Sequence, residues 1–161
     1  MLIFAIDPGT TKSGYAVFDM PDFKLHEFGK IENENLLEKL TAWDTPAHVF
    51  IEMVSSYGKP VGREVFRTCV WIGVFERECT CNGFFKSVKE IIRRDVKTAL
   101  GANIRATDTD IRHMLIRRYA KFDFKTGKGT KNNPDVFHGV SADVWQAIAA
   151  GVAGFFTEAG K

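Results

Sequence analysis

The sequence has 161 residues, the size of one ordinary domain, so we expect a single domain over 1–161 and exclude two-lobed kinases. Hydrophobic residues make up 45% of the chain and charged residues 26%, which favours a packed core over a disordered chain. No apolar stretch approaches the ~18 residues that cross a membrane, and the start lacks the basic region of a secretory signal, so we expect a cytoplasmic protein. We expect its three cysteines to be reduced, the alternative being a metal-binding pair at Cys79 and Cys81.

The net charge of +2 hides an uneven distribution of charge along the chain. Residues 86–131 carry thirteen Lys or Arg against five Asp or Glu, a net charge of +8, whereas the segments before and after this block are acidic. A basic block of this size favours binding of a polyanion such as a nucleic acid. The alternative is a solvated helical surface that has no partner.

Short apolar runs separated by turn residues predict a β-meander at the start of the chain, followed by alternating helices and strands. This order is typical of a mixed α/β fold, and we expect a five-stranded sheet with helices on both faces. A Gly- and Lys-rich segment at 122–136 is expected to form a mobile loop. In chain order, we expect strands at 2–6, 14–18, 24–31, 48–52 and 84–88, and helices at 33–42, 61–81, 93–100, 109–121 and 141–156.

Three carboxylates occupy positions where an unpartnered acid is costly. Asp7 and Glu52 each end an apolar strand, and Asp143 lies in the first turn of an otherwise apolar helix. If the first and fourth strands are neighbours, these acids converge, and carboxylates without a Cys or His set favour Mg²⁺ or Mn²⁺. Taken singly, each acid has a structural alternative. Asp7 could cap the Pro8–Gly9 turn, Glu52 could pair with an arginine, and Asp143 could interact favourably with the helix dipole.

Four stretches of the sequence, at 5–16, 51–65, 94–103 and 127–145, carry a resemblance to a known family. They contain Ala-Ile-Asp-Pro-Gly-Thr-Thr, Ile-Glu followed by Ser-Ser-Tyr-Gly-Lys-Pro, Arg-Asp-Val-Lys, and Gly-Lys-Gly-Thr-Lys followed by Gly-Val-Ser-Ala-Asp. Together they resemble the RuvC-like Holliday junction resolvases of the RNase H-like superfamily, most closely those of phages and prophages. The first stretch alone also resembles the opening of sugar kinases and actin-like ATPases.

The resemblance implies a homodimer that nicks branched DNA with a divalent metal ion and needs no nucleotide cofactor. It matches Asp7, Glu52 and Asp143 to three of the family's four acidic positions. The fourth acid is expected three residues before the last one, where this chain has Val140, which cannot bind a metal ion. His138 is the nearest alternative ligand, and otherwise it is an ordinary loop residue.

Basic and aromatic residues around these stretches are candidates for DNA contacts, because flexible cations near a carboxylate cluster steer phosphates. The helix at 61–75 is the candidate dimer helix, the alternative being that its apolar stripe packs within the chain. The expected nucleic-acid-binding residues are Tyr57, Lys59, Arg63, Lys89, Arg93, Arg94, Lys97, Lys128 and Lys131.

The sequence therefore predicts a metal-dependent crossover junction endodeoxyribonuclease whose cofactor is Mg²⁺ or Mn²⁺ and whose substrate is branched DNA. One alternative is a DNA-binding protein of the same fold that has no catalytic activity, which the missing fourth acid favours. The other is a phosphotransferase of the actin-like or sugar-kinase type, which the small size of the chain disfavours.

Overall fold

The structure, a computed structural model, describes residues 1–55, 58 and 60–159 and centres on one five-stranded sheet. The strand order is β3-β2-β1-β4-β5. β2 runs antiparallel to both β1 and β3, whereas β4 is parallel to β1 and β5 is parallel to β4. This arrangement confirms the predicted mixed sheet. The strands are β1 (Leu2–Asp7), β2 (Lys12–Asp19), β3 (Lys24–Glu32), β4 (Ala47–Met53) and β5 (Phe85–Ile92).

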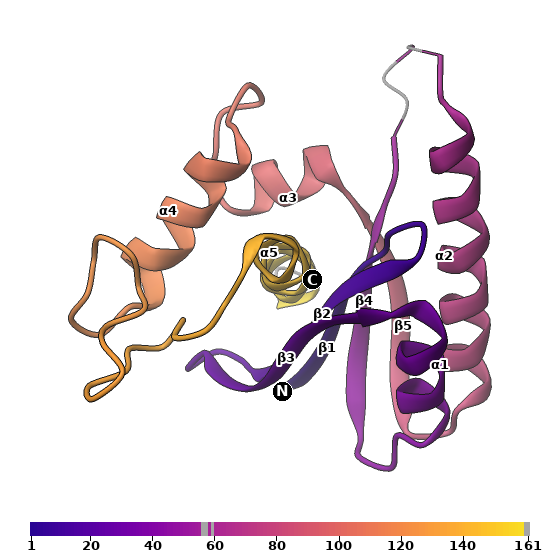
Figure 1. Ribbon diagram of the computed structural model, residues 1–161, viewed down its shortest axis with the longest axis horizontal. Coiled ribbons are helices and arrows are strands. Elements are labelled where there is room, and N and C mark those ends of the chain that lie inside the picture. Colours follow the sequence, from indigo (N-terminus) through magenta and orange to yellow (C-terminus); the bar gives the residue numbers. More distant parts are fainter. Residues whose placement is uncertain (56–57, 59, 160–161) are drawn as a thin grey trace.

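Helices cover both faces of the sheet, as predicted (Figure 1). One face carries α1 (Asn33–Thr41) and α2 (Arg63–Cys81), and the other carries α5 (Ala142–Ala159) with α3 (Arg93–Ala99) and α4 (Asp108–Tyr119) beyond it. Among the described residues, no helix is long and apolar enough to cross a membrane.

The alternation of side chains along β1 divides the core into two halves. Phe4 and Ile6 pack on the side of α1 and α2, whereas Ile3 and Ala5 pack on the side of α5. Helix α5 lies close against the sheet because the helix presents glycines to the sheet. A Cβ on Gly154 of α5 would lie 2.2 Å from the ring of Phe50 on β4. The next residue of β1 on the α5 side is Asp7, so this carboxylate points into the space beside that helix.

Two elements differ from the sequence-based expectation. Strand β5 extends to Ile92 rather than ending near residue 88, because its parallel register with β4 continues to the pair Met53–Ile92. The segment at 122–136, expected to be a mobile loop, is an ordered loop cross-linked by hydrogen bonds. The buried carboxylate of Asp135 accepts backbone N–H bonds from Lys121, Phe122 and Asp123.

Candidate active site

The ends of two neighbouring strands bring the first two acids together. β1 and β4 are parallel, with Ile6 opposite Ile51, so the following residues, Asp7 and Glu52, lie side by side at the same edge. Glu52 faces the α5 side because Phe50, two residues earlier, packs there. The sequence-based expectation that the first and fourth strands are neighbours is confirmed.

A missing side chain lets the third acid approach the other two. Gly14 of β2 lies opposite Asp7, and a Cβ on Gly14 would lie 2.7 Å from the backbone oxygen of Asp143. Because cross-strand partners share a face of the sheet, Asp7 and the start of α5 lie on the same side. Any larger residue at position 14 would therefore push Asp143 away from Asp7.

The turn that follows Asp7 is fixed by a buried polar network. The Ser13 hydroxyl donates to the Asn33 side-chain oxygen at 2.7 Å and accepts the Gly9 N–H at 3.2 Å. The Asn33 amide donates in turn to the Gly9 carbonyl at 3.0 Å. Ser13 and Asn33 are fully buried, so this satisfied network holds the β1–β2 turn in one conformation and fixes the end of β1.

The surroundings of the acids oppose their negative charge. Burial raises the pKa of Asp7 to about 8, and the charges of Glu52 and Asp143 act in the same direction. Burial also raises the pKa of Glu52 to about 7, although the charge of Arg93 offsets part of that effect. The Oε2 atom of Glu52 is buried and has no hydrogen-bond partner. The site therefore holds more negative charge than its own residues compensate, which suits a cation.

One arginine joins Glu52 to a fourth carboxylate. Arg93, at the start of α3, places Nη1 3.7 Å from Glu52 Oε1, and its Nη2 pairs with Asp108 at the start of α4. The Arg93 side chain is only 17% exposed, and its Nη1 atom makes no hydrogen bond. The charge of Asp108 raises the pKa values of both Asp7 and Glu52, so Asp108 belongs to the same electrostatic group.

A lysine engages the third acid. Lys30 of β3 lies opposite Gly14, and its Nζ pairs with Oδ2 of Asp143 across the space that a larger side chain at position 14 would fill. Among the described residues, no three His, Cys, Asp or Glu side chains are close enough to hold a metal ion in this arrangement. The donors nevertheless fit a hard divalent cation in their chemistry, because they are carboxylate oxygens and one of them is buried without a partner. Such a cation would compete with Lys30 for Asp143.

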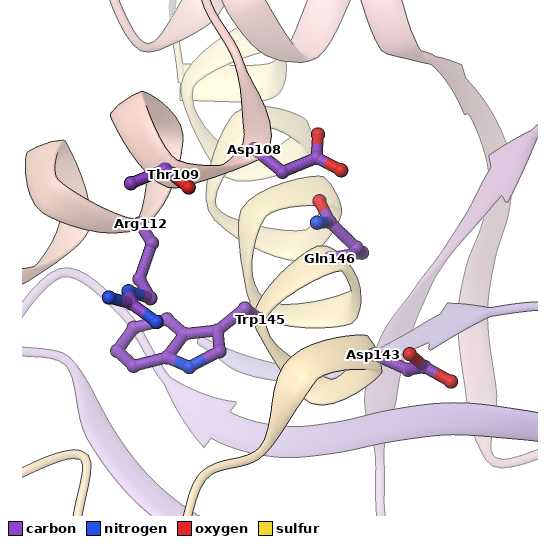
Figure 2. A pocket seen from close by; sticks show the side chains of 6 residues that line it. All are labelled: Asp108, Thr109, Arg112, Asp143, Trp145 and Gln146. Carbon is purple, nitrogen blue, oxygen red and sulfur yellow. The ribbon is translucent and has the colours of Figure 1, made fainter.

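A shallow pocket of about 300 Å³ opens beside Asp143. Figure 2 shows Asp108 and Gln146 facing each other across it, with Asp143 one turn before Gln146 on α5. The Oε1 atom of Gln146 is buried and has no hydrogen-bond partner in the described structure. Gln146 therefore offers an uncharged oxygen that could bind a cation beside Asp108 and Asp143.

Val140 and His138 both lie in the segment just before α5. Val140 is fully buried in the core on the α5 side of the sheet, so it contributes packing. His138 is exposed, and its Nδ1 lies 3.0 Å from the carbonyl oxygen of Lys128. That contact ties its ring to the loop rather than to the acids, and a metal-binding role for His138 stays a prediction.

The expected DNA-binding residues are spread over several elements. Arg93 lies inside the acidic site, whereas Lys89 pairs with Glu158 near the other end of α5. Asp143 and Glu158 are fifteen positions, or about 22 Å, apart along the helix, so the structure does not bring Lys89 to Asp143. Arg63 is exposed at the start of α2. The other expected contacts on described elements are Arg94 and Lys97 on α3 and Lys128 and Lys131 on the loop before α5, while Tyr57 and Lys59 lie outside the described residues.

Sequence reasoning missed Lys30, Asp108 and Gln146 as neighbours of the acids. Gln146 could have been found, because a residue three positions after Asp143 shares its helix face. The closeness of Asp108 to Glu52 depends on the packing of α4, for which the sequence contains no local signal. Lys30 reaches Asp143 only through the β2–β3 register, for which the sequence contains no local signal.

Comparison with known proteins supports this architecture at the level of structure. No protein-family model and no curated protein sequence matches the chain. A solved structure of Thermus thermophilus RuvC is similar, with a TM-score of 0.69 at 17% identity, over 99% of this chain and 96% of that one. T. thermophilus RuvC in complex with a Holliday junction substrate gives a TM-score of 0.70 at 16% identity, over 99% and 95% of the two chains. The chain therefore has a RuvC-like fold of the RNase H-like class.

Proposed function

We propose that this protein is a divalent-cation-dependent endonuclease that nicks four-way or otherwise branched DNA by phosphodiester hydrolysis. The observation that carries the proposal is the pair Asp7 and Glu52 at neighbouring strand ends, whose pKa values are raised by burial, with the charge of Asp143 adding to the effect on Asp7. A bound cation would compensate this excess of buried negative charge. The RuvC-like fold and the basic block at 86–131 support DNA as the substrate.

Asp7, Glu52 and Asp143 would hold Mg²⁺ or Mn²⁺, and Gln146 offers a further oxygen nearby. When bound, the ion supplies a Lewis acid that activates water and stabilises the charge of the leaving oxygen. The buried Ser13–Asn33 network keeps Asp7 in place at the end of β1.

Two cations of the chain are placed to act on the substrate. Lys30 pairs with Asp143, and a cation bound to Asp143 would free the Lys30 ammonium group, which could then balance the charge of a bound phosphate. Arg93 holds Glu52 and Asp108 together at the other side of the site. Arg93 is a positioning residue in this proposal, whereas Lys30 would contact the substrate itself.

The proposal includes a homodimer, because two symmetric sites would give paired nicks in a two-fold branched substrate. Helix α2 supports it: Thr68, Ile72 and Phe75 are buried against the sheet, whereas Phe66 and Val70, one turn apart, are 61% and 67% exposed. One face of α2 therefore packs within the chain, and the exposed face that carries Phe66 and Val70 is free to form the proposed dimer contact. Sedimentation equilibrium distinguishes the dimer from a monomer.

The test is nicking of an end-labelled four-way junction and a linear duplex of the same arm sequence, in Mg²⁺, Mn²⁺ or EDTA. We expect paired nicks in the junction only, and we expect Asp7→Asn to lower the rate by about 100-fold or more while leaving junction binding intact. Asp22→Asn, at an exposed turn position, is the matched control and should cut normally. Junction binding without cutting in either metal would instead favour a DNA-binding protein that has no catalytic activity.

A further inference from the structure

Two phenylalanine rings are exposed to solvent on the loop that joins α4 to α5. Phe122 is 48% exposed and Phe124 is 60% exposed, whereas Phe137, at the end of the same loop, is fully buried. Burying a phenylalanine side chain stabilises a fold by about 1.5–3 kcal/mol, so two exposed rings in one short segment forgo a substantial gain. Neighbouring exposed rings of this kind mark a surface that binds something.

The rings are exposed on an ordered backbone. Asp135 Oδ2 accepts the N–H of Phe122 at 3.0 Å and that of Asp123 at 2.7 Å. Asp123 accepts in turn from the N–H groups of Lys125 at 3.2 Å and Gly129 at 3.0 Å. The backbone around both rings is therefore cross-linked, and the rings are presented from a preorganised loop, which lowers the entropic cost of binding.

Cations flank the rings on both sides. The local sequence is Lys121-Phe122-Asp123-Phe124-Lys125, and both lysines are exposed. None of the ion pairs within the described residues includes Lys121 or Lys125. The lysines at both ends and the two exposed rings suit a ligand that is both anionic and flat-faced, which describes unpaired nucleotides. The Asp123 carboxylate between the rings accepts backbone N–H groups of its own loop.

The loop also connects directly to the acidic site. Phe137 lies with its ring centroid 4.6 Å from that of Trp145, two residues after Asp143 on α5. Figure 1 shows the loop running along α4 and back to the start of α5. The buried contact between Phe137 and Trp145 joins the end of the loop to the first turns of α5, the helix that carries Asp143.

We propose that Phe122 and Phe124 form a stacking platform for unpaired bases, with Lys121 and Lys125 binding the adjacent phosphates. This inference rests on the proposed function in one respect: the unpaired bases are those that a branched DNA exposes near its crossover. It adds a second contact region, separate from the acids, that binds single-stranded DNA by itself.

The test measures binding in EDTA, where no cutting occurs, with three probes: a fluorescein-labelled single-stranded 20-mer, the matching duplex, and a four-way junction with 2-aminopurine at the crossover. The double variant Phe122→Leu/Phe124→Leu keeps apolar bulk and removes both rings, and Phe122→Tyr/Phe124→Tyr keeps the rings. Phe84→Leu is the matched control, because Phe84 is 46% exposed at the start of β5, the opposite end of the parallel strands from the acids.

We expect the double leucine variant to bind the single strand and the junction at least about ten-fold more weakly and the duplex within two-fold, and to weaken the 2-aminopurine response. The tyrosine variant and Phe84→Leu should bind like the wild type, with unchanged melting temperatures throughout. Equal losses on all three probes, or no loss on any, would overturn the platform. So would a change in sedimentation mass of the leucine variant, because the rings would then bind a second copy of the chain.

The two proposals fail separately. If the wild type nicks junctions and the leucine variant binds every probe normally, the platform is wrong and the nuclease stands. If ring-dependent binding of single strands is found but no junction is nicked in any metal, the platform stands and the nuclease is wrong.

Discussion

Two groups of carboxylates in this protein have opposite surroundings. In the acidic site, Asp7 and Glu52 are nearly buried, lie beside each other, and Glu52 has an oxygen without any partner. In the loop before α5, Asp135 is 5% exposed, yet its oxygens accept four backbone N–H groups. The first surroundings raise the pKa values to about 8 and about 7. In the second, burial favours the neutral acid, but the hydrogen bonds outweigh it and lower the pKa of Asp135 to about 2.

The contrast separates a structural acid, Asp135, from the two proposed cation ligands, Asp7 and Glu52. A buried carboxylate whose oxygens are all satisfied by the backbone stabilises the conformation around it and has no capacity left for a ligand. A buried carboxylate that lacks partners costs stability unless a cation joins it, which is why Asp7 and Glu52 are proposed as cation ligands. Burial alone does not distinguish the two, whereas the hydrogen-bond partners do.

The largest effect on stability is expected at the structural acid. Asp135→Asn replaces one acceptor oxygen with an NH₂ group that faces backbone donors, and we expect the free energy of unfolding to fall by about 3 kcal/mol or more. Urea unfolding at pH 7 measures it, with Asp22→Asn, at an exposed turn, expected to change stability by less than about 0.5 kcal/mol. Equal unfolding midpoints for the two variants would mean that Asp135 does not organise the loop.

A smaller effect of opposite direction is expected at the functional acid. Because burial raises the folded-state pKa values of Asp7 and Glu52 above their ordinary values, the folded state binds more protons than the unfolded chain between pH 4 and pH 8. Stability in EDTA should therefore fall as the pH rises through this range, and Asp7→Asn should raise the free energy of unfolding at pH 9 by roughly 1–3 kcal/mol.

Melting curves in EDTA at pH 5, 7 and 9 test this sign, and added Mn²⁺ should restore the stability of the wild type at pH 9 more than that of the variant. If Asp7→Asn destabilised the protein at every pH, Asp7 would be a structural acid like Asp135. The comparison between the two regions would then fail.

The smallest effect is expected at the lysine that engages Asp143. Lys30 and Asp143 are both partly exposed, so their ion pair is weak, and Lys30→Met should tighten Mn²⁺ binding by only about two- to five-fold. Isothermal titration calorimetry measures this, with Lys39→Met as the control, because Lys39 pairs with Glu27 on the other side of the sheet. Weaker Mn²⁺ binding by the Lys30 variant would show that Lys30 supports the site rather than competing for it.

Much of the fold could be predicted from local sequence patterns. The five strands, the five helices and the ends of β1 and β4 follow from apolar runs and turn residues, and so do two of the three acids. The order in the loop before α5 was missed, because Asp123 and Asp135 lie twelve residues apart and each bonds backbone groups that no side-chain pattern reveals.

The surroundings of the acids were less accessible from sequence. The direction of α3 relative to β5 decides whether Arg93 contacts Glu52 or is free to contact DNA. The closeness of Asp108 to Arg93 depends on the packing of α4. The role of Gly14 needed the position of α5 against β2, since a glycine in a strand has several common explanations. Long-range packing, rather than local propensity, sets these contacts.

The proposed cation site requires that the negative charges of Asp7 and Glu52 have no compensating partner until a cation binds. A carboxyl ¹³C NMR titration tests this most directly. In EDTA, the account predicts midpoints near 8 for Asp7 and near 7 for Glu52, with Asp135 staying ionised down to about pH 3. Saturating Mg²⁺ should lower the first two midpoints and leave the third unchanged. Midpoints near 4 for Asp7 and Glu52 in EDTA, unmoved by Mg²⁺, would contradict the account.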